Sequence, residues 1–335
     1  MIPQMSSRLI ACSALLLSAC VSAGSTVSSA SPSTSAPASV SAASIPAPRV
    51  DYHQHLVSPA FEPIVKLPAR DGRKLVAELD AAGIGKAVVL SVGYSFADER
   101  KNLPNPDSLT RAENDWTAAQ VAGSGGRLIG FCSANPMRAA ALAELERCLA
   151  LPGMVGIKQH MGNGGVTLRD TSHLRRMQDV FRLAQRLGRP VLVHMRARGG
   201  ANYDGQDARL FLSQVVPIAP GIEIVVAHLG YSGPGYPDAD SVMAAFGEAA
   251  ERNDPSMRNV YFDVATNVTA ESTPENLARV ARRIRQVGVR RVVYGSDLSP
   301  PGGSIEAGWE IFRDRVPLTD EEKRTIASNV ASFAR

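Results

Sequence analysis

The sequence predicts an α/β protein built as a (β/α)₈ TIM barrel, a single domain that follows an export signal and a linker. From residue 49 onward, short apolar runs rich in β-branched residues alternate with helical segments, which is typical of buried parallel strands. Eight such strand–helix units fit into about 250 residues, the usual size of this barrel. A doubly wound open sheet is the alternative, but no G-x-G-x-x-G turn follows the first strand.

The first 48 residues read as a targeting segment and a tether. Arg8 supplies a positive charge before the apolar run 9–17, which is too short to span a membrane as a mature helix. The sequence Leu17-Ser18-Ala19-Cys20 resembles the lipobox of bacterial lipoproteins, with an ordinary secretory signal as the alternative. We therefore expect a signal peptide over residues 1–19 and lipidation of Cys20. Residues 20–48, rich in Ser, Ala and Pro, form a flexible tether before the barrel domain of residues 49–335.

The eight expected strands are short, and most of the helices between them are amphipathic. Glycines follow three of the helices, as is common at helix C-termini. The strands are expected at 50–55, 86–92, 128–134, 154–160, 190–194, 222–228, 260–265 and 291–297. The helices between them are expected at 75–82, 112–121, 139–151, 172–187, 208–216, 241–252, 274–287 and 305–316. A further helix, 320–333, begins after Thr319, and Glu322 completes a capping-box spacing.

Composition and cysteine content narrow the class of protein. The 335 residues are 44% hydrophobic and 20% charged, which fits a globular enzyme with a sizeable core. The net charge of +4 is mild and the arginines are dispersed, so no nucleic-acid partner is expected. Beyond the leader and Cys20, only Cys132 and Cys148 remain. A disulfide between them is possible, but we expect two buried, unpaired thiols.

Histidine and aspartate side chains stand at the ends of four expected strands. His53 and His55 share one side of the first strand, and His194, His228 and Asp297 end the fifth, sixth and eighth. In a (β/α)₈ barrel these ends converge on one face, where active sites lie. Imidazole and carboxylate ligands suit Zn²⁺, which lowers the pKa of a bound water to about 7.

This ordered set resembles the amidohydrolase superfamily, within its amidohydrolase-related branch, over residues 49–335. The resemblance rests on Asp51-x-His53-x-His55, the histidines of strands five and six, and Gly295-Ser296-Asp297. It implies that the metal ligands are His53, His55, His194 and Asp297. It also implies that Asp297 takes a proton from the attacking water, while His228 orients that water or polarises the substrate's oxygen.

Lys158, at the end of the fourth strand, leaves the metal count open. In two-metal members of the superfamily a carboxylated lysine at this strand bridges both ions, whereas this branch more often has one. We expect one divalent ion, Zn²⁺, with Lys158 as a substrate-binding or structural cation. His160 shares the side of Lys158 and is a candidate for the pocket, while Arg196 and Arg198 could clamp a substrate carboxylate. Loop or surface roles are the alternatives for these three residues.

The expected function is hydrolysis of a lactone, amide or ester in a small-molecule substrate. The alternative is a metal-dependent decarboxylase or hydratase acting on an aromatic or unsaturated acid, because relatives in this branch cleave C–C bonds. A non-catalytic binding lipoprotein is a third hypothesis, which the retained ligand set disfavours. The leader predicts export, with the protein lipid-anchored in the bacterial cell envelope or free in the periplasm. We expect the protein to contact the membrane only through the lipid. The sequence does not decide whether it forms a homo-oligomer.

Overall fold

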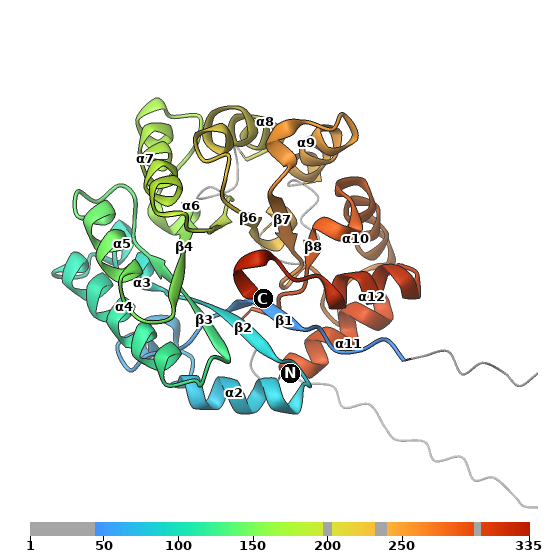
Figure 1. Cartoon of the computed structure of the whole chain (residues 1–335), viewed down its shortest axis with the longest axis horizontal. Helices are drawn as coiled ribbons and strands as arrows, with labels where there is room; N and C mark the ends of the chain where they lie inside the picture. The colour runs from blue at the N-terminus through green and yellow to red at the C-terminus, as the bar shows by residue number, and fades with distance from the viewer. Residues whose placement is uncertain (1–43, 197–202, 232–239, 298–302) are drawn as a thin grey trace, which may run out of the picture. The chain divides into compact units, whose positions relative to one another are not determined.

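Eight parallel strands form one sheet that follows the order of the sequence, with the helices arranged around it (Figure 1). The computed structural model describes residues 44–196, 203–231, 240–297 and 303–335. The strands are β1 Val50–Gln54, β2 Lys86–Leu90, β3 Leu128–Ser133, β4 Met154–His160, β5 Val191–His194, β6 Ile224–Val226, β7 Val260–Asp263 and β8 Val292–Val293. Backbone hydrogen bonds from Tyr52 to Tyr294 (2.8 Å) and from Asp297 to His53 (2.7 Å) connect the first strand to the chain around the eighth. The predicted (β/α)₈ barrel is therefore confirmed.

The large helices pack their apolar sides against the outside of this barrel. They are α2 Gly72–Ala81, α4 Pro106–Ala122, α5 Ala141–Leu149, α7 Thr171–Leu187, α8 Gly205–Leu210, α9 Asp240–Glu251, α10 Pro274–Val287, α11 Ile305–Arg315 and α12 Asp320–Ser328. In α10 the buried residues Leu277, Val280, Ala281 and Ile284 recur at helical spacing. Thr319 caps α12 in the predicted capping box with Glu322. Within the described part of the chain, no helix combines the length and hydropathy that a membrane span requires.

Three short helices were not expected from the sequence. They are α1 Glu62–Val65, α3 Gly93–Phe96 and α6 Met161–Gly164, and they follow strands β1, β2 and β4. Each has only four residues, too few for the apolar periodicity that identifies a helix. Because they follow the carboxyl ends of strands, they lie at the face where the predicted site residues converge.

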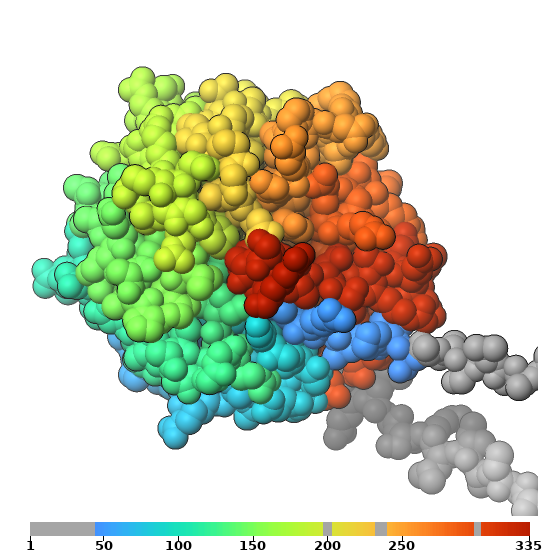
Figure 2. Space-filling model, in the orientation of Figure 1, coloured from blue at the N-terminus to red at the C-terminus, as the bar shows by residue number. Residues whose placement is uncertain are grey.

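The C-terminal segment closes the opposite end of the barrel. Phe333, in the 3₁₀ turn η8 Ser332–Ala334, packs edge-on against Tyr52 and Phe131 of the inner core, with ring centroids 5.8 and 5.4 Å away. The amide of Ala331 donates to the Tyr52 hydroxyl at 2.7 Å. In Figure 2 this segment, in dark red, covers the centre of the face shown. The C-terminal segment therefore covers the inner core at the end of the barrel opposite the carboxyl ends of the strands.

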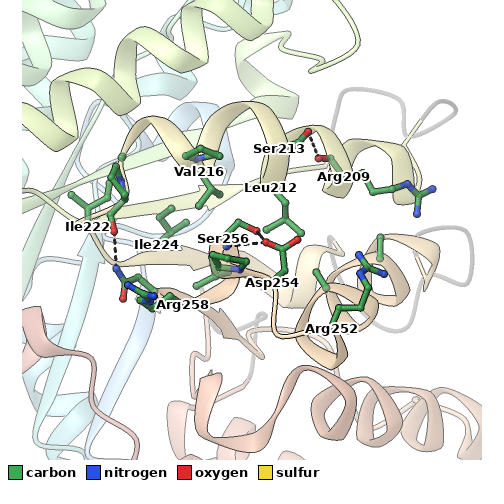
Figure 3. A pocket seen from close by; sticks show the side chains of 18 residues that line it. Arg209, Leu212, Ser213, Val216, Ile222, Ile224, Arg252, Asp254, Ser256 and Arg258 are labelled. Carbon is green, nitrogen blue, oxygen red and sulfur yellow. Dashed lines mark hydrogen bonds between the residues drawn. The ribbon is translucent and has the colours of Figure 1, made fainter.

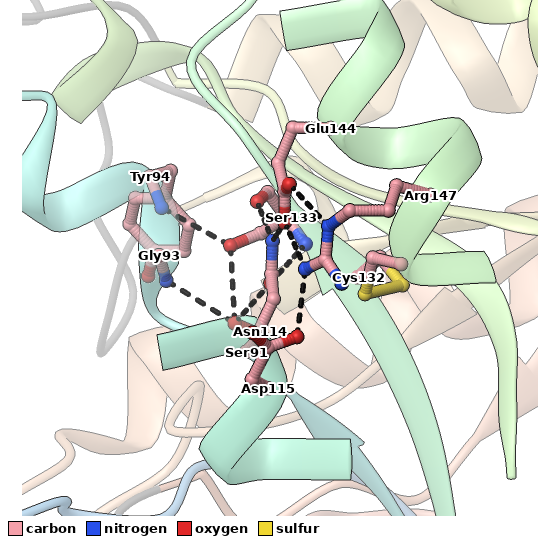
Figure 4. Close-up of a disulfide and its surroundings, with 10 residues drawn as sticks. Ser91, Gly93, Tyr94, Asn114, Asp115, Cys132, Ser133, Glu144 and Arg147 are labelled. Atoms are coloured by element: carbon pink, nitrogen blue, oxygen red, sulfur yellow. Dashed lines mark hydrogen bonds and ion pairs between the residues drawn. A yellow bond between two sulfur atoms is a disulfide. The ribbon is translucent and has the colours of Figure 1, made fainter. Parts of the chain in front are cut away.

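The prediction of two unpaired thiols is wrong, because Cys132 and Cys148 form a disulfide. Cys132 lies in β3 and Cys148 in α5, and both are fully buried (Figure 4). The helix carries Cys148 back over the strand, which brings the two Cα atoms to 6.0 Å, within the range that a disulfide spans. Sequence spacing alone could not reveal this approach, since it depends on how α5 packs on the sheet.

We expect the disulfide to stabilise the fold measurably. It closes a loop with a sequence separation of 16, for which loop-closure entropy corresponds to about 3 kcal/mol. A Cys132→Ala/Cys148→Ala variant should lose about this much free energy of unfolding, measured by urea denaturation. Adding a reductant should lower the free energy of unfolding of the unmodified protein by a similar amount and leave that of the variant unchanged. Equal stability of both proteins under oxidising conditions would contradict this account.

Glu113 of α4 is a buried carboxyl group outside the predicted site. Ser58 donates to its Oε2 atom at 2.6 Å, while Oε1 has no hydrogen-bond partner among the described residues. Burial raises the pKa of Glu113 to about 7. The folded state therefore binds the proton of Glu113 more tightly than the unfolded chain does. This contribution to the stability of the fold is complete below the ordinary pKa near 4.5 and is lost as the pH rises through 7.

A Glu113→Gln variant should consequently gain stability relative to the unmodified protein as the pH rises. From pH 5 to pH 8.5 we expect the difference in free energy of unfolding to move by about 2–3 kcal/mol in favour of the variant. Urea denaturation of both proteins at the two pH values measures it. The same difference at both values would show that Glu113 ionises as freely in the folded state as in the unfolded chain.

Candidate metal and active site

A polar pocket of 230 Å³ lies at the carboxyl ends of the strands. It is lined by His53, His55, Tyr94, Lys158, His160, His194, His228, Thr266 and Asp297. Every predicted strand-end histidine is present, together with Asp297, Lys158 and His160. Arg196 is not among the lining residues that the structure describes, and Arg198 and Cys20 lie outside the described residues.

Three histidines point the same ring nitrogen away from the pocket. The Nδ1 atom of His53 lies 2.9 Å from Asp263 Oδ2. That of His55 lies 2.7 Å from the Leu90 carbonyl, and that of His228 lies 2.8 Å from the Ala265 carbonyl. Since these oxygens accept hydrogen bonds, each Nδ1 carries the proton and donates. The Nε2 atom of each ring then faces the pocket as an acceptor, the arrangement that second-shell acceptors produce around metals, although at His53 it also faces Lys158 Nζ at 3.4 Å.

The remaining donor atoms converge on one point. Asp297 lies between two of the rings, with Oδ1 3.8 Å from His55 Nε2 and Oδ2 3.9 Å from His228 Nε2. One ligand atom each from His53, His55 and Asp297 lie within 4.8 Å of one another. Ligands of a tetrahedral zinc ion lie about 2 Å from the metal, so small side-chain rotations would close this set around a cation. The residues therefore fit the divalent metal that the sequence predicts.

Burial keeps these imidazoles in the form that binds a metal. It lowers the pKa of His55 to about 4 and holds the pKa of His53 well below the usual value, an effect that the charge of Lys158 reinforces. Both rings are then neutral at neutral pH, with the single proton on Nδ1, and no proton has to leave Nε2 when a cation binds.

His194 lies in the same pocket but in a different arrangement. Its ring stacks on His160 with centroids 4.0 Å apart and meets His228 edge-on at 4.9 Å. Among the described residues it belongs to neither group of three donors close enough to share an ion. Its role as a fourth metal ligand stays a prediction.

Asp263 of β7 organises two of the histidines at once. Its Oδ2 atom accepts from the His53 ring, and its Oδ1 atom accepts from the backbone amides of His228 (2.8 Å) and Ala265 (3.1 Å). His228 has φ of 55°, a left-handed conformation unusual for a residue with a side chain. The sequence predicted a strand as far as His228, but β6 ends at Val226, and this turn aims the ring into the pocket.

Asp297 is held in a similar way. It also has a positive φ, 63°, and follows β8 by four residues instead of ending it. Before it, Ser296 donates its amide (3.1 Å) and hydroxyl (2.5 Å) to Asp51, which also accepts from Gln54 and from the amide of His53. This buried network connects the two segments that supply the candidate ligands. Strained backbone of this kind costs about 1–3 kcal/mol per residue and persists where surrounding contacts hold it.

The wall formed by β2 and β4 carries hydrogen-bond donors. Lys158 is fully buried, with Nζ 3.4 Å from His53 Nε2, and burial lowers its pKa to about 8, so it remains a cation at neutral pH. His160 Nδ1 accepts from the amide of Asn163 at 3.2 Å, which leaves the proton on Nε2. Tyr94 stacks on His160 at 4.8 Å, and burial raises the pKa of its hydroxyl, which stays protonated.

Tyr94 was missed by sequence reasoning because it lies in the short helix α3. Its amide donates to the Ser133 hydroxyl at 3.1 Å, and Ser91 donates to Asn114 at 2.7 Å in the same network (Figure 4). Asn114 Nδ2 in turn donates to the Ser133 carbonyl at 3.0 Å. The fully buried Asn114 therefore links α4 to the ends of β2 and β3 and fixes the turn that presents Tyr94.

Comparison with known proteins identifies the family. The profile of the amidohydrolase family matches residues 50–331, and no curated protein matches the chain. A putative amidohydrolase from Staphylococcus aureus has a similar structure, with 17% identity, 85% of this chain and 99% of that chain covered, and a TM-score of 0.61.

Two further solved structures share the fold. A 5-carboxyvanillate decarboxylase from Novosphingobium aromaticivorans, with bound manganese, is 15% identical, with 86% of this chain and 97% of that one covered and a TM-score of 0.57. A probable 2-pyrone-4,6-dicarboxylic acid hydrolase from Acinetobacter baumannii is 16% identical, with 83% and 95% covered and a TM-score of 0.50. At these identities the structures support the fold, and the profile match establishes that the chain belongs to the amidohydrolase family.

Proposed function

We propose that the protein is a metal-dependent hydrolase that uses an activated water to attack a lactone, amide or ester carbonyl. The observation that carries this proposal is the position of Asp297. Its carboxylate lies within 4 Å of the Nε2 atoms of two imidazoles, those of His55 and His228. A base beside a set of candidate metal ligands is the arrangement that water activation requires.

The chain's own residues divide the work between two sides of the pocket. When bound, a divalent cation, Zn²⁺ in our proposal, would supply Lewis acidity toward the substrate oxygen and the water. His53, His55, His194 and Asp297 would hold one such ion. Asp297 takes the proton from the water as the new bond to the carbonyl carbon forms.

In our proposal His228 orients the attacking water. Its Nδ1 atom donates to the Ala265 carbonyl, so a ring that carries one proton accepts at Nε2. It therefore orients the water by accepting from an O–H group, whereas polarising a carbonyl would require a second ring proton. Negative charge that develops on the substrate is instead stabilised by the donor wall of Lys158, His160 and Tyr94.

A metal-dependent decarboxylase or hydratase is the second candidate. The same donor wall favours it, since an ammonium, an imidazole N–H and a phenol together could bind a substrate carboxylate. Arg196 and Arg198, which follow His194 in the sequence, are further candidates for binding that carboxylate. One structural neighbour is a decarboxylase and another a probable hydrolase, so the reaction has to be decided by product analysis.

Purified protein and two substrate panels separate these reactions. We expect lactones, esters or amides to be turned over with addition of water, and the turnover to stop with a chelator and return with Zn²⁺. Release of CO₂ from aromatic or unsaturated acids, with the same chelator sensitivity, would establish the decarboxylase instead. Turnover that is indifferent to chelation would overturn both.

We also propose that the protein is exported and anchored through a lipid on Cys20. The buried Cys132–Cys148 disulfide supports an oxidising compartment, because such bonds are rare in reducing cytosol. Mass spectrometry of the mature N-terminus should find a diacylglyceryl-modified Cys20, and Cys20→Ala should abolish it. An unmodified mature N-terminus at another residue would indicate an ordinary secretory signal.

A further inference from the structure

A second cavity lies on the outer side of the barrel, away from the polar pocket. It has a volume of 630 Å³ and is formed between the segment after α8 on one side and α9 with the following turn on the other (Figure 3). Its apolar lining includes Leu212, Val216, Ile222, Ile224, Ala245 and Ala249. We call this cavity the outer groove. It is more than twice as large as the polar pocket and falls within the range of small-molecule sites.

An irregular helix creates the outer groove. The sequence predicted one helix over 208–216, but α8 ends at Leu210 and is followed by a π-helical turn, Phe211–Val215, and a 3₁₀ turn, Val216–Ile218. Pro217 cannot donate a backbone hydrogen bond, which prevents a regular continuation. The facing helix α9 presents Ala245 and Ala249, whose methyl groups leave the space unfilled. Short π-helical turns are frequent at functional sites.

The outer groove is separate from the catalytic face. Ile224 and Val260, which line it, are the first residues of β6 and β7. The polar pocket lies beyond the other ends of these two strands, at His228 and Thr266. A ligand in the outer groove would therefore not contact the candidate metal site.

The charged groups at this groove are mostly positive. Arg209, Arg252 and Arg258 are exposed, while Asp254 is the single carboxylate among the described lining residues. Asp254 already accepts from the amide (2.9 Å) and hydroxyl (2.7 Å) of Ser256. Arg252 and Arg258 have no carboxylate within 4.0 Å in the described part of the chain. An apolar cavity whose charged rim is mostly positive complements an organic anion with an apolar body.

We propose that the outer groove binds an amphipathic organic anion of the aliphatic carboxylate class. The hydrocarbon chain lies along the apolar lining, and the carboxylate is held by Arg252, which follows α9 at one end of the groove (Figure 3). Such a ligand needs both the apolar lining and the guanidinium group. A neutral apolar compound would use only the lining, and a small hydrophilic anion would use only the guanidinium group.

Calorimetric titration of the full chain with decanoate, 1-decanol and butyrate tests the proposal. Decanoate should bind with a stoichiometry of one, 1-decanol should bind about tenfold more weakly, and butyrate should give no binding. Arg252→Gln should weaken decanoate binding about fivefold, as expected for one partly exposed ion pair, and leave 1-decanol binding unchanged. Arg175→Gln, an exposed arginine of α7, is the matched control and should change neither affinity.

Two further variants locate the binding site. Ser213→Trp places a large ring in the groove from its exposed rim and should abolish decanoate binding with little change in thermal stability. His53→Ala, which alters only the polar pocket, should leave decanoate binding intact. Absence of binding, binding that survives Ser213→Trp, or loss of binding in His53→Ala would each overturn the proposal. So would dissociation of a dimer by Ser213→Trp, because the groove would then be an interface between copies of the chain.

Discussion

Replacing Asp297 with asparagine is expected to lower kcat/KM by about 10³-fold or more. The amide can still offer an oxygen to a cation, but it cannot take a proton from water, and general-base catalysis contributes about 10²–10⁴-fold. The metal content should therefore fall much less than the rate. Steady-state kinetics with parallel metal analysis separates these two effects.

A matched variant controls for the loss of a negative charge. Asp179→Asn removes an exposed carboxylate of α7 that pairs with Arg182, far from the pocket in the fold, and should retain full activity. If Asp297→Asn kept more than a tenth of the activity, Asp297 would not be the base. Equal loss in both variants would point to a general effect of charge.

Replacing Asp263 with asparagine is expected to weaken metal binding by about 10- to 100-fold. The carboxylate accepts from three N–H groups, on the His53 ring and on the backbones of His228 and Ala265. An amide has only one oxygen, so its NH₂ group must face one of these donors. The His53 ring would lose its fixed orientation, and loss of such a second-shell acceptor typically has this magnitude.

Asp51→Asn is the appropriate comparison for this variant. Asp51 is equally buried and belongs to the same region, but it contacts the backbone of His53 and the side chains of Gln54 and Ser296, not an imidazole. Titration with Zn²⁺ against a competing chelator should show a clear loss of affinity for Asp263→Asn and little for Asp51→Asn. Unchanged affinity in Asp263→Asn would mean that His53 needs no acceptor to keep its orientation.

The sequence predicted the site best where residues of metal-binding type stand at the ends of predicted strands. His53 and His55 share one face of a strand because side chains alternate, and each later candidate followed its own apolar run. The order of strands in a (β/α)₈ barrel then brings them together, and the structure places all of the predicted strand-end residues in one pocket. These inferences need only periodicity and topology.

Features that depend on tertiary packing were missed. The left-handed turn at His228 requires a carboxylate from β7 to hold the amide, and Tyr94 reaches the pocket only because α3 forms after β2. The Cys132–Cys148 bond and the π-helical turn after α8 likewise depend on how helices lie on the sheet. Local sequence carries no signal for such contacts between distant segments.

Metal stoichiometry is the most direct test of the account. The unmodified protein should contain about one divalent ion per chain by elemental analysis, and a His53→Ala/His55→Ala variant should contain none. His173→Ala, which removes a histidine outside the pocket, should match the unmodified protein. A protein without stoichiometric metal after incubation with Zn²⁺, or a double variant that retains the ion, would contradict the proposed metal site.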